Sequence, residues 1–363
     1  MATINVNYSE EQSARRRRRK LPAYVFLLSA LLSSADCVWA GNAYPANPYV
    51  TGRAIFVAQQ HGVTRFDTGQ LQPLWSARAD SSDDATVVTV QAVLVGSSHG
   101  LTAFDPATGS LLWHLASDAR LFSPSVADGV AYVGSKNGIL RAVQVETGRV
   151  LWQRRFNGWV YAPAIVGERL IVGGQSQRLY ALDRANGQLL WDIPLSQEMV
   201  YRPVAVESAG SDIVVVTLFS GEIIALHAAD GRLHWRARED VASLSPVSAN
   251  GRLYFRTMGG PLKVRGAADG RLLWQSRQAL SSHPIRVVTG RVIARDDSGK
   301  IVVLNAFDGT VLWQRSTHGQ SIGSSILLAD DRLVLFTESP GASRLARPNV
   351  FPLLTAVEEE ETP

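Results

Sequence analysis

The sequence of this 363-residue chain predicts an all-β fold, a β-propeller built from four-stranded antiparallel blades. Three observations predict it. Tryptophan recurs at a nearly constant interval, short β-branched runs separated by turn residues fill each interval, and a proline recurs at a similar place in five of the six intervals. A period of about 40 residues without a helical pattern indicates small sheets repeated around an axis.

The repeat is marked by seven tryptophans, which follow one another at intervals of 38, 39, 39, 44, 39 and 39 residues. They are Trp75, Trp113, Trp152, Trp191, Trp235, Trp274 and Trp313. A large indole on the outermost strand of a blade can fill the wedge between two neighbouring sheets. We therefore interpret these residues as structural blade anchors and not as a cofactor-binding motif.

The third repeat shows the expected strands of one blade. They are Ser123–Ala127, Val130–Ser135, Ile139–Val145 and Val150–Arg154. Asn137-Gly138 predicts a tight hairpin between the middle two, because both turn positions of a type I′ turn need positive φ. Prolines recur ten to twelve residues after a tryptophan, at Pro124, Pro163, Pro203, Pro246 and Pro284, and Pro48 holds the same place before the first blade. Proline cannot donate to a strand ladder, so it belongs at the start of an innermost strand.

The chain is expected to comprise a signal peptide (1–40), one propeller domain (41–357) and a solvated acidic tail (358–363). After the seventh tryptophan, Ser324–Leu328 and Arg332–Thr337 repeat the first two strands of a blade. Val350–Val357, or Asn42–Ala46 from the N-terminus, is expected to add a further strand. We predict eight blades, seven anchored by tryptophan and one irregular closing blade, with seven blades as the alternative.

The N-terminal segment predicts export. A basic run, Arg15–Lys20, precedes an apolar run, Leu21–Leu32, and Val38-Trp39-Ala40 offers small residues for cleavage after Ala40. A periplasmic location follows, with association with the outer membrane as a further expectation. A retained signal anchor is the alternative, and the sequence leaves open Sec or twin-arginine export and the lipidation of Cys37.

The charge of the chain argues against nucleic-acid binding. Its pI is about 9.3, but removing the six basic and three acidic residues of positions 1–40 leaves 30 basic and 29 acidic residues. A nearly neutral body lacks the cationic surface that follows phosphates.

Residues 41–363 contain no cysteine, which excludes an internal disulfide and a thiol nucleophile there. We expect a monomer.

No set of residues with catalytic spacing stands out, so we predict that the protein is not an enzyme and carries no cofactor and no metal. Asp296-Asp297 and Asp330-Asp331 are interpreted as turn residues. His61 and His99 fall in corresponding hairpins, so a metal site between neighbouring blades is the alternative interpretation of that pair.

A family resemblance rests on one repeated phrase. Ala103–Trp113 (AFDPATGSLLW) fits A-x-D-x-x-T-G-x-x-x-W throughout, and the segment that ends at Trp191 fits with one change. This phrase resembles the pyrroloquinoline quinone (PQQ)-like β-propeller repeat family, and the resemblance covers residues 48–337. The family includes quinoprotein dehydrogenases as well as non-catalytic proteins, so the resemblance implies the fold more strongly than an activity.

Among the non-catalytic members, the chain resembles the BamB family of outer-membrane assembly factors in size, export and single-domain build. That resemblance implies a protein-binding scaffold of the cell envelope, with outer-membrane assembly proteins as partners. Two features depart from it: the surroundings of Cys37 fit a lipidation signal poorly, and the loop Ser196–Arg202 lacks the family's Arg-containing stretch. The alternative is a periplasmic propeller that binds PQQ, another quinone or a small ligand, with an oxidoreductase activity.

Two neighbouring loops carry the candidate binding surface, Arg155–Tyr161 and Ser196–Arg202. Propellers bind through such loops because a rigid scaffold holds them in place. Their candidate partner-binding residues are Arg155, Trp159, Tyr161, Met199, Tyr201 and Arg202. Arg, Trp, Tyr and Met are enriched at protein interfaces. Packing at the start of a strand is the alternative role for the two tyrosines.

Overall fold

The computed structural model describes residues 49–352 except 52, 60–61, 80–85, 200, 207–211, 241, 244–245, 258–259, 281–284, 297, 299, 317–321, 328–331 and 338–348. The expected signal peptide, the acidic tail, His61 and Asn42–Ala46 therefore lie outside the described residues. Within them the chain forms strands and turns. No helix there is long and apolar enough to cross a membrane.

Seven sheets contain four antiparallel strands each, in sequence order. Blade 1 holds β1 (Tyr49–Thr51), β2 (Ala54–Gln59), β3 (Gly62–Asp67) and β4 (Pro73–Arg78); blade 2 holds β5 (Thr86–Val88), β6 (Val93–Gly96), β7 (Gly100–Phe104) and β8 (Leu111–Ala116). Blade 3 holds β9 (Ser125–Ala127), β10 (Val130–Val133), β11 (Ile139–Gln144) and β12 (Val150–Arg155); blade 4 holds β13 (Ala164–Val166), β14 (Arg169–Gly173), β15 (Arg178–Asp183) and β16 (Leu189–Pro194).

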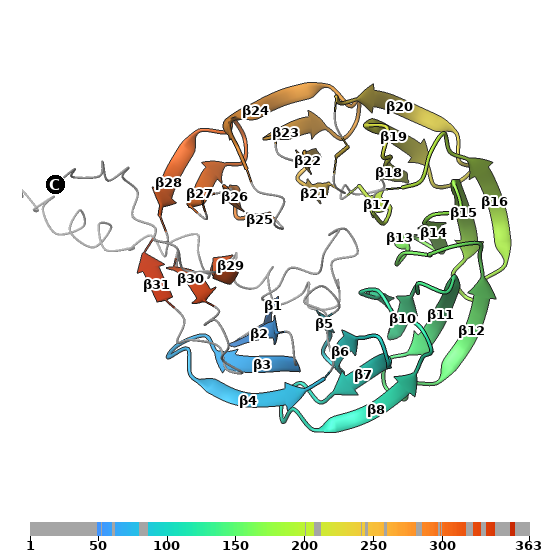
Figure 1. The fold of residues 1–363 in the computed structure, drawn as a ribbon, viewed down its shortest axis with the longest axis horizontal. Helices are drawn as coiled ribbons and strands as arrows, with labels where there is room; N and C mark the ends of the chain where they lie inside the picture. The colour runs from blue at the N-terminus through green and yellow to red at the C-terminus, as the bar shows by residue number, and fades with distance from the viewer. Residues whose placement is uncertain are drawn as a thin grey trace, which may run out of the picture. The chain divides into compact units, whose positions relative to one another are not determined.

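Blade 5 holds β17 (Val204–Ala205), β18 (Ile213–Thr217), β19 (Glu222–His227) and β20 (Leu233–Arg238); blade 6 holds β21 (Val247–Ala249), β22 (Arg252–Arg256), β23 (Pro261–Gly266) and β24 (Leu272–Ala279). Blade 7 holds β25 (Arg286–Val288), β26 (Arg291–Arg295), β27 (Ile301–Asn305) and β28 (Val311–Arg315). Figure 1 shows the sheets following one another around a ring, with the first strand of each blade inside and the fourth outside. The predicted all-β propeller of four-stranded blades is confirmed.

A three-stranded sheet stands between blades 7 and 1 (Figure 1). It consists of β29 (Ile322–Leu327), β30 (Arg332–Thr337) and β31 (Asn349–Pro352). Leu333 packs against blade 7, and its neighbour Val334 packs against blade 1, so this eighth sheet contacts both neighbours. The added strand is β31; the end of the predicted strand Val350–Val357 lies outside the described residues.

Six anchor tryptophans join their blade to the next one in the same way. The indole N–H donates to a backbone carbonyl in the turn before the outer strand of the next blade, over 2.9–3.3 Å. In blade 6, Gly270 has a φ of +71° and lies under the ring of Trp235, where an added Cβ would be 2.5 Å from the ring. The indole therefore packs directly on backbone, which only glycine permits at this turn.

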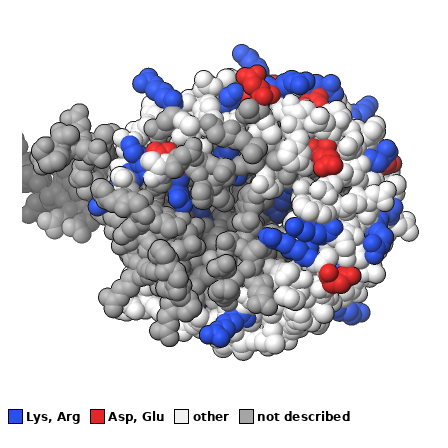
Figure 2. Space-filling view, in the orientation of Figure 1, with Lys and Arg blue, Asp and Glu red and all other residues white. Residues whose placement is uncertain are grey.

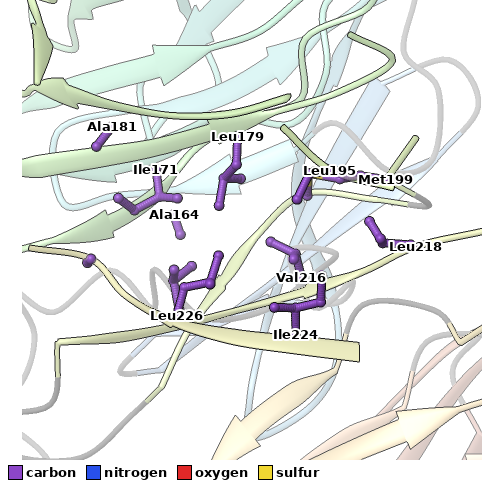
Figure 3. Close-up of a cluster of buried hydrophobic side chains, with 12 residues drawn as sticks. Ala164, Ile171, Leu179, Ala181, Leu195, Met199, Val216, Leu218, Ile224 and Leu226 are labelled. Atoms are coloured by element: carbon purple, nitrogen blue, oxygen red, sulfur yellow. The ribbon is translucent and has the colours of Figure 1, made fainter. Parts of the chain in front are cut away.

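The core lies between neighbouring blades. Figure 3 shows the cluster between blades 4 and 5, where Ile171 and Leu179 of blade 4 face Val216 and Ile224 of blade 5. Met199, from the connection between these two blades, is fully buried in the same cluster. Inter-blade burial of this kind holds the loops at the blade ends on a rigid frame.

Candidate protein-binding surface

The connections that lead into blades 3, 4, 5 and 6 each run beside a hairpin of the blade that they enter. Isolated bridges fix this arrangement at Leu121↔Ser135, Val160↔Gly174, Met199↔Leu218 and Ser243↔Thr257. Next to three of these bridges, a hairpin N–H donates to a connection carbonyl: Lys136 to Arg120 over 3.0 Å, Gln175 to Trp159 over 3.1 Å and Phe219 to Glu198 over 3.3 Å. These six residues, which we call the loop arc, occupy repeated positions on one face of blades 3 to 5.

Trp159 is the centre of the loop arc. Its indole is half-buried, and the ammonium of Lys136 lies 4.3 Å from the ring centroid. The ring of Phe122 is 6.3 Å away, and the backbone N–H of Trp159 donates to the side-chain carbonyl of Gln175 over 3.4 Å. A cation over the face of an indole is attracted to the ring, so Lys136 restricts the orientation of the Trp159 side chain and places a positive charge next to it.

A second row of aromatic side chains follows the connections. The rings of Phe122 and Tyr161, which belong to neighbouring connections, meet edge to face at 5.1 Å. Burial, with smaller effects from Tyr201 and Glu198, raises the pKa of Tyr161. Its hydroxyl is therefore neutral at physiological pH, and it can either donate or accept a hydrogen bond.

The hairpin that presents Lys136 is held by side-chain hydrogen bonds. Asn137 Nδ2 donates to Asp118 over 2.8 Å, and Ser135 Oγ donates to Asn137 Oδ1 over 2.6 Å. Arg155 Nη1 donates to the Asn137 carbonyl over 3.3 Å. Figure 2 shows Lys and Arg surface gathered over blade 3, next to a smaller acidic area.

The predicted surface residues differ in their solvent exposure in the structure. Trp159, Tyr161 and Tyr201 are half-buried, and Arg155 is exposed at the end of β12. Arg202 is only 8% exposed, and Met199 is 0% exposed. Including Met199 in the surface was wrong: it stands at the bridge position that Leu121 and Val160 occupy in the preceding blades, and its side chain points into the core.

Three surface residues were missed from the sequence: Phe122, Lys136 and Phe219. Phe219 is 54% exposed at the tip of the β18–β19 hairpin. The sequence did signal Phe219: it is a bulky apolar residue at a hairpin position where blades 3 and 4 carry the polar residues Lys136 and Gln175. Nothing in the sequence indicated that Lys136 lies over Trp159, because these residues belong to different loops.

Of the candidate chemical sites from the sequence, Asp296 and His99 lie in the described part of the chain, whereas Asp297, Asp330 and Asp331 lie outside it. Asp296 accepts the backbone N–H groups of Ser298 and Lys300, each over 2.9 Å, as a turn carboxylate does. His99 pairs with Ser98 at 3.2 Å. Among the described residues, no three His, Cys, Asp or Glu side chains group as metal ligands would.

The fold and the loop arc define a β-propeller that presents aromatic and cationic loops on a rigid ring. The family model described as outer membrane protein assembly factor BamB matches residues 33–120, 59–208 and 202–341. The chain belongs to this family. No protein of curated function matches the sequence.

Solved structures of three kinds share the fold. The computationally designed Ika8 protein has a TM-score of 0.68 at 15% identity, covering 86% of this chain and 97% of its own. BamB from Moraxella catarrhalis has a TM-score of 0.61 at 15% identity, covering 80% and 93%. Quinohemoprotein alcohol dehydrogenase from Comamonas testosteroni has a TM-score of 0.63 at 14% identity, covering 82% and 70%.

Proposed function

We propose that the protein is a non-catalytic scaffold of the bacterial cell envelope that binds a partner protein through the loop arc. Membership of the BamB family supports outer-membrane protein assembly, or a related envelope complex, as the setting. The basic and apolar runs before residue 40 support export to the periplasm. Nucleic acid is not proposed as a partner, because the body of the chain is nearly neutral.

The observation that carries this proposal is the pairing of Trp159 with Lys136, together with the exposed ring of Phe219 at the corresponding hairpin position of blade 5. Large aromatic side chains provide much contact area at a small cost in side-chain entropy, and they dominate many interface hot spots. The hairpin and connection hydrogen bonds hold these loops before a partner arrives. Less ordering is then required on binding.

The test is capture of partners from the envelope with the tagged full-length chain. The double variant Trp159→Ala/Phe219→Ala is expected to lose most of the captured envelope proteins. Phe307→Ala is the matched control, because Phe307 is 72% exposed in the β27–β28 turn, which lies at the opposite end of the strands. Unchanged capture by the double variant would show that the binding surface lies elsewhere.

The second candidate is a propeller that binds PQQ, another quinone or a small ligand. It is supported by the fold shared with quinohemoprotein alcohol dehydrogenase. Thermal unfolding of the purified protein with and without added PQQ and Ca²⁺ tests it. A ligand that binds only the folded state raises the melting temperature. An unchanged melting temperature at saturating PQQ removes PQQ as the ligand of this candidate.

A further inference from the structure

The junction between blades 5 and 6 differs in chemistry from the junction before it. The cluster between blades 4 and 5 contains five buried apolar side chains that Figure 3 labels: Leu195, Met199, Leu218, Ile224 and Leu226. The strand register, the isolated bridges and the connection hydrogen bonds assign each of them a counterpart at the next junction. In the same order, the counterparts are Glu239, Ser243, Thr257, Lys263 and Arg265. All five are polar or charged.

The charged side chains of this junction carry an excess of positive charge. Lys263 and Arg265 both donate to the carboxylate of Glu239, and among the described residues no second carboxylate forms a salt bridge with either cation. The side chain of Glu239 is 3% exposed, that of Lys263 is 21% exposed and that of Arg265 is 13% exposed. Charge that is removed from water needs a partner of opposite sign. One carboxylate balances one of the two cations, so the junction favours one more negative charge.

Two buried hydroxyl groups lie at the same junction. Thr217 is 1% exposed and Ser243 is 0% exposed. Neither hydroxyl has a hydrogen-bond partner within the part of the chain that the structure describes. Buried hydroxyls are almost always hydrogen-bonded, so two unsatisfied ones at one place indicate a group that both of them bind.

The repeat shows that these two hydroxyls face one another. Counted from the residue in line with the anchor tryptophan, Thr217 holds in blade 5 the place that Gly173 holds in blade 4. Ser243 holds the bridge position of Met199. At the preceding junction, a Cβ added to Gly173 would lie 2.1 Å from the sulfur of Met199. Side chains at these two positions therefore meet across the junction.

The hydroxyls also lie near the excess charge. Thr257 is the bridge partner of Ser243, and it stands two residues after Phe255, which is opposite Lys263. Phe255 packs against blade 5, so Lys263 and Thr257 are diagonal neighbours on the face of blade 6 that meets blade 5. Such neighbours are separated by about 7–8 Å, a distance that a lysine side chain can span. Hydroxyl and ammonium donors are therefore brought to the same place.

We propose that the junction between blades 5 and 6 binds a small monovalent anion of the size of chloride. The anion accepts hydrogen bonds from Thr217 and Ser243, and it balances the positive charge that Glu239 leaves uncompensated. Hydroxyl groups can donate to an anion, and the positive charge of the junction disfavours a cation there. The enclosure of both hydroxyls favours a small ion, and the partly exposed Lys263 connects the site with solvent. The site is separate from the loop arc and does not depend on the function proposed for it.

The first measurement is the melting temperature of the purified protein in sodium chloride and in sodium gluconate at equal ionic strength. A ligand that binds only the folded state raises the melting temperature. We expect a value about 2–6 °C higher in chloride. Equal melting temperatures in the two salts overturn the proposal.

The second measurement locates the site. The double variant Thr217→Val/Ser243→Ala is expected to lose the rise in chloride. Thr86→Val is the matched control, because Thr86 of blade 2 is 9% exposed and its hydroxyl also lacks a partner among the described residues. The control is expected to keep the rise. A rise that persists in the double variant shows that chloride acts elsewhere.

The third measurement tests the role of the charge. Lys263→Met is expected to increase the chloride concentration that gives half of the rise by about tenfold, because a charge-assisted interaction is lost. Lys136→Met, in the loop arc, is the control and should leave that concentration unchanged. An unchanged concentration in Lys263→Met contradicts the proposed charge balance.

Crystals of the full chain grown in sodium bromide give a direct view of the ion. An anomalous difference peak is expected within hydrogen-bonding distance of the hydroxyls of Thr217 and Ser243. A water molecule at that place without an anomalous peak overturns the proposal.

Discussion

At the scale of single residues, the buried carboxylate of Glu239 replaces an apolar side chain of the repeat. Its backbone N–H donates to the hairpin carbonyl of Gly221, as those of Phe156, Leu195 and Leu280 donate to their own hairpins. Those three are buried apolar residues. Glu239 is 5% exposed and is compensated by Lys263 and Arg265 of blade 6.

Burial by itself raises the pKa of Glu239, but the hydrogen bonds from Lys263 and Arg265 outweigh it, so the pKa is lowered overall. A depressed pKa contributes stability above the unfolded-state value of about 4.3, and this stability is lost as the pH falls through the folded-state pKa. Glu239→Gln leaves two partly buried cations without their carboxylate, and it is expected to cost about 3–5 kcal/mol at pH 7. Urea unfolding of both proteins at pH 7 and in the acid range checks this, and a difference independent of pH would contradict it.

Two glycines of blade 6 separate backbone strain from steric contact. Gly251 and Gly270 have φ values of +70° and +71°, but an added Cβ meets nothing within 4 Å at Gly251 and meets the ring of Trp235 at 2.5 Å at Gly270. Gly251→Ala is expected to cost about 1 kcal/mol from backbone strain. Gly270→Ala is expected to cost about 1–3 kcal/mol more, because the indole must move. Equal unfolding free energies for the two variants would exclude the contact as the cause.

At the scale of elements, each of the seven blades contains a bulge just before its anchor tryptophan. The register of the third and outer strands shifts between the partner of the tryptophan and the next residue, as between Ala181 and Leu182 in blade 4. The same shift occurs in the other six blades. A bulge adds one residue to one strand and turns the following side chain. The bulge therefore orients the indole of the anchor tryptophan toward the next blade.

The bulge residue of blade 4, Leu190, gives a direct test. Leu190 is 49% exposed, so Leu190→Ala is expected to change the unfolding free energy by less than about 1 kcal/mol. Deleting Leu190 shifts Trp191 by one position and moves its indole off the inter-blade face, at an expected cost of about 3–5 kcal/mol. Similar stabilities of the two variants would show that the bulge does not position the tryptophan.

At the scale of the whole molecule, the three-stranded sheet stands between blades 7 and 1. Leu333 and Val334 are both 0% exposed and face opposite neighbours, blade 7 and blade 1. Leu333→Ala is expected to lower the unfolding free energy by about 2–5 kcal/mol, because it leaves a cavity at this junction. The control is Leu312→Ala, at an outer-strand residue that is 36% exposed. Equal decreases in the melting temperature of Leu333→Ala and Leu312→Ala would show that packing at this junction contributes no more to stability than an exposed outer-strand residue does.

The candidate surface shows how far the sequence could be read. Trp159 was identifiable because it is the one tryptophan of residues 41–363 outside the repeat series, and Tyr161 was identifiable by its residue type. Phe219 could have been found by a comparison of corresponding hairpin positions. Met199 could not be excluded by residue type, because its burial depends on a neighbouring blade that closes over the bridge position.

The sequence alone determined the blade period, the strand order within each blade and the role of the tryptophans, because these follow from local turn chemistry and from a side-chain alternation that repeats in every blade. Only the tertiary structure decided which loops meet, where Lys136 lies over Trp159 and that Met199 belongs to the core. Those outcomes depend on contacts between residues of different loops and blades. A local sequence pattern does not specify which side chain of a neighbouring loop or blade will contact a given residue.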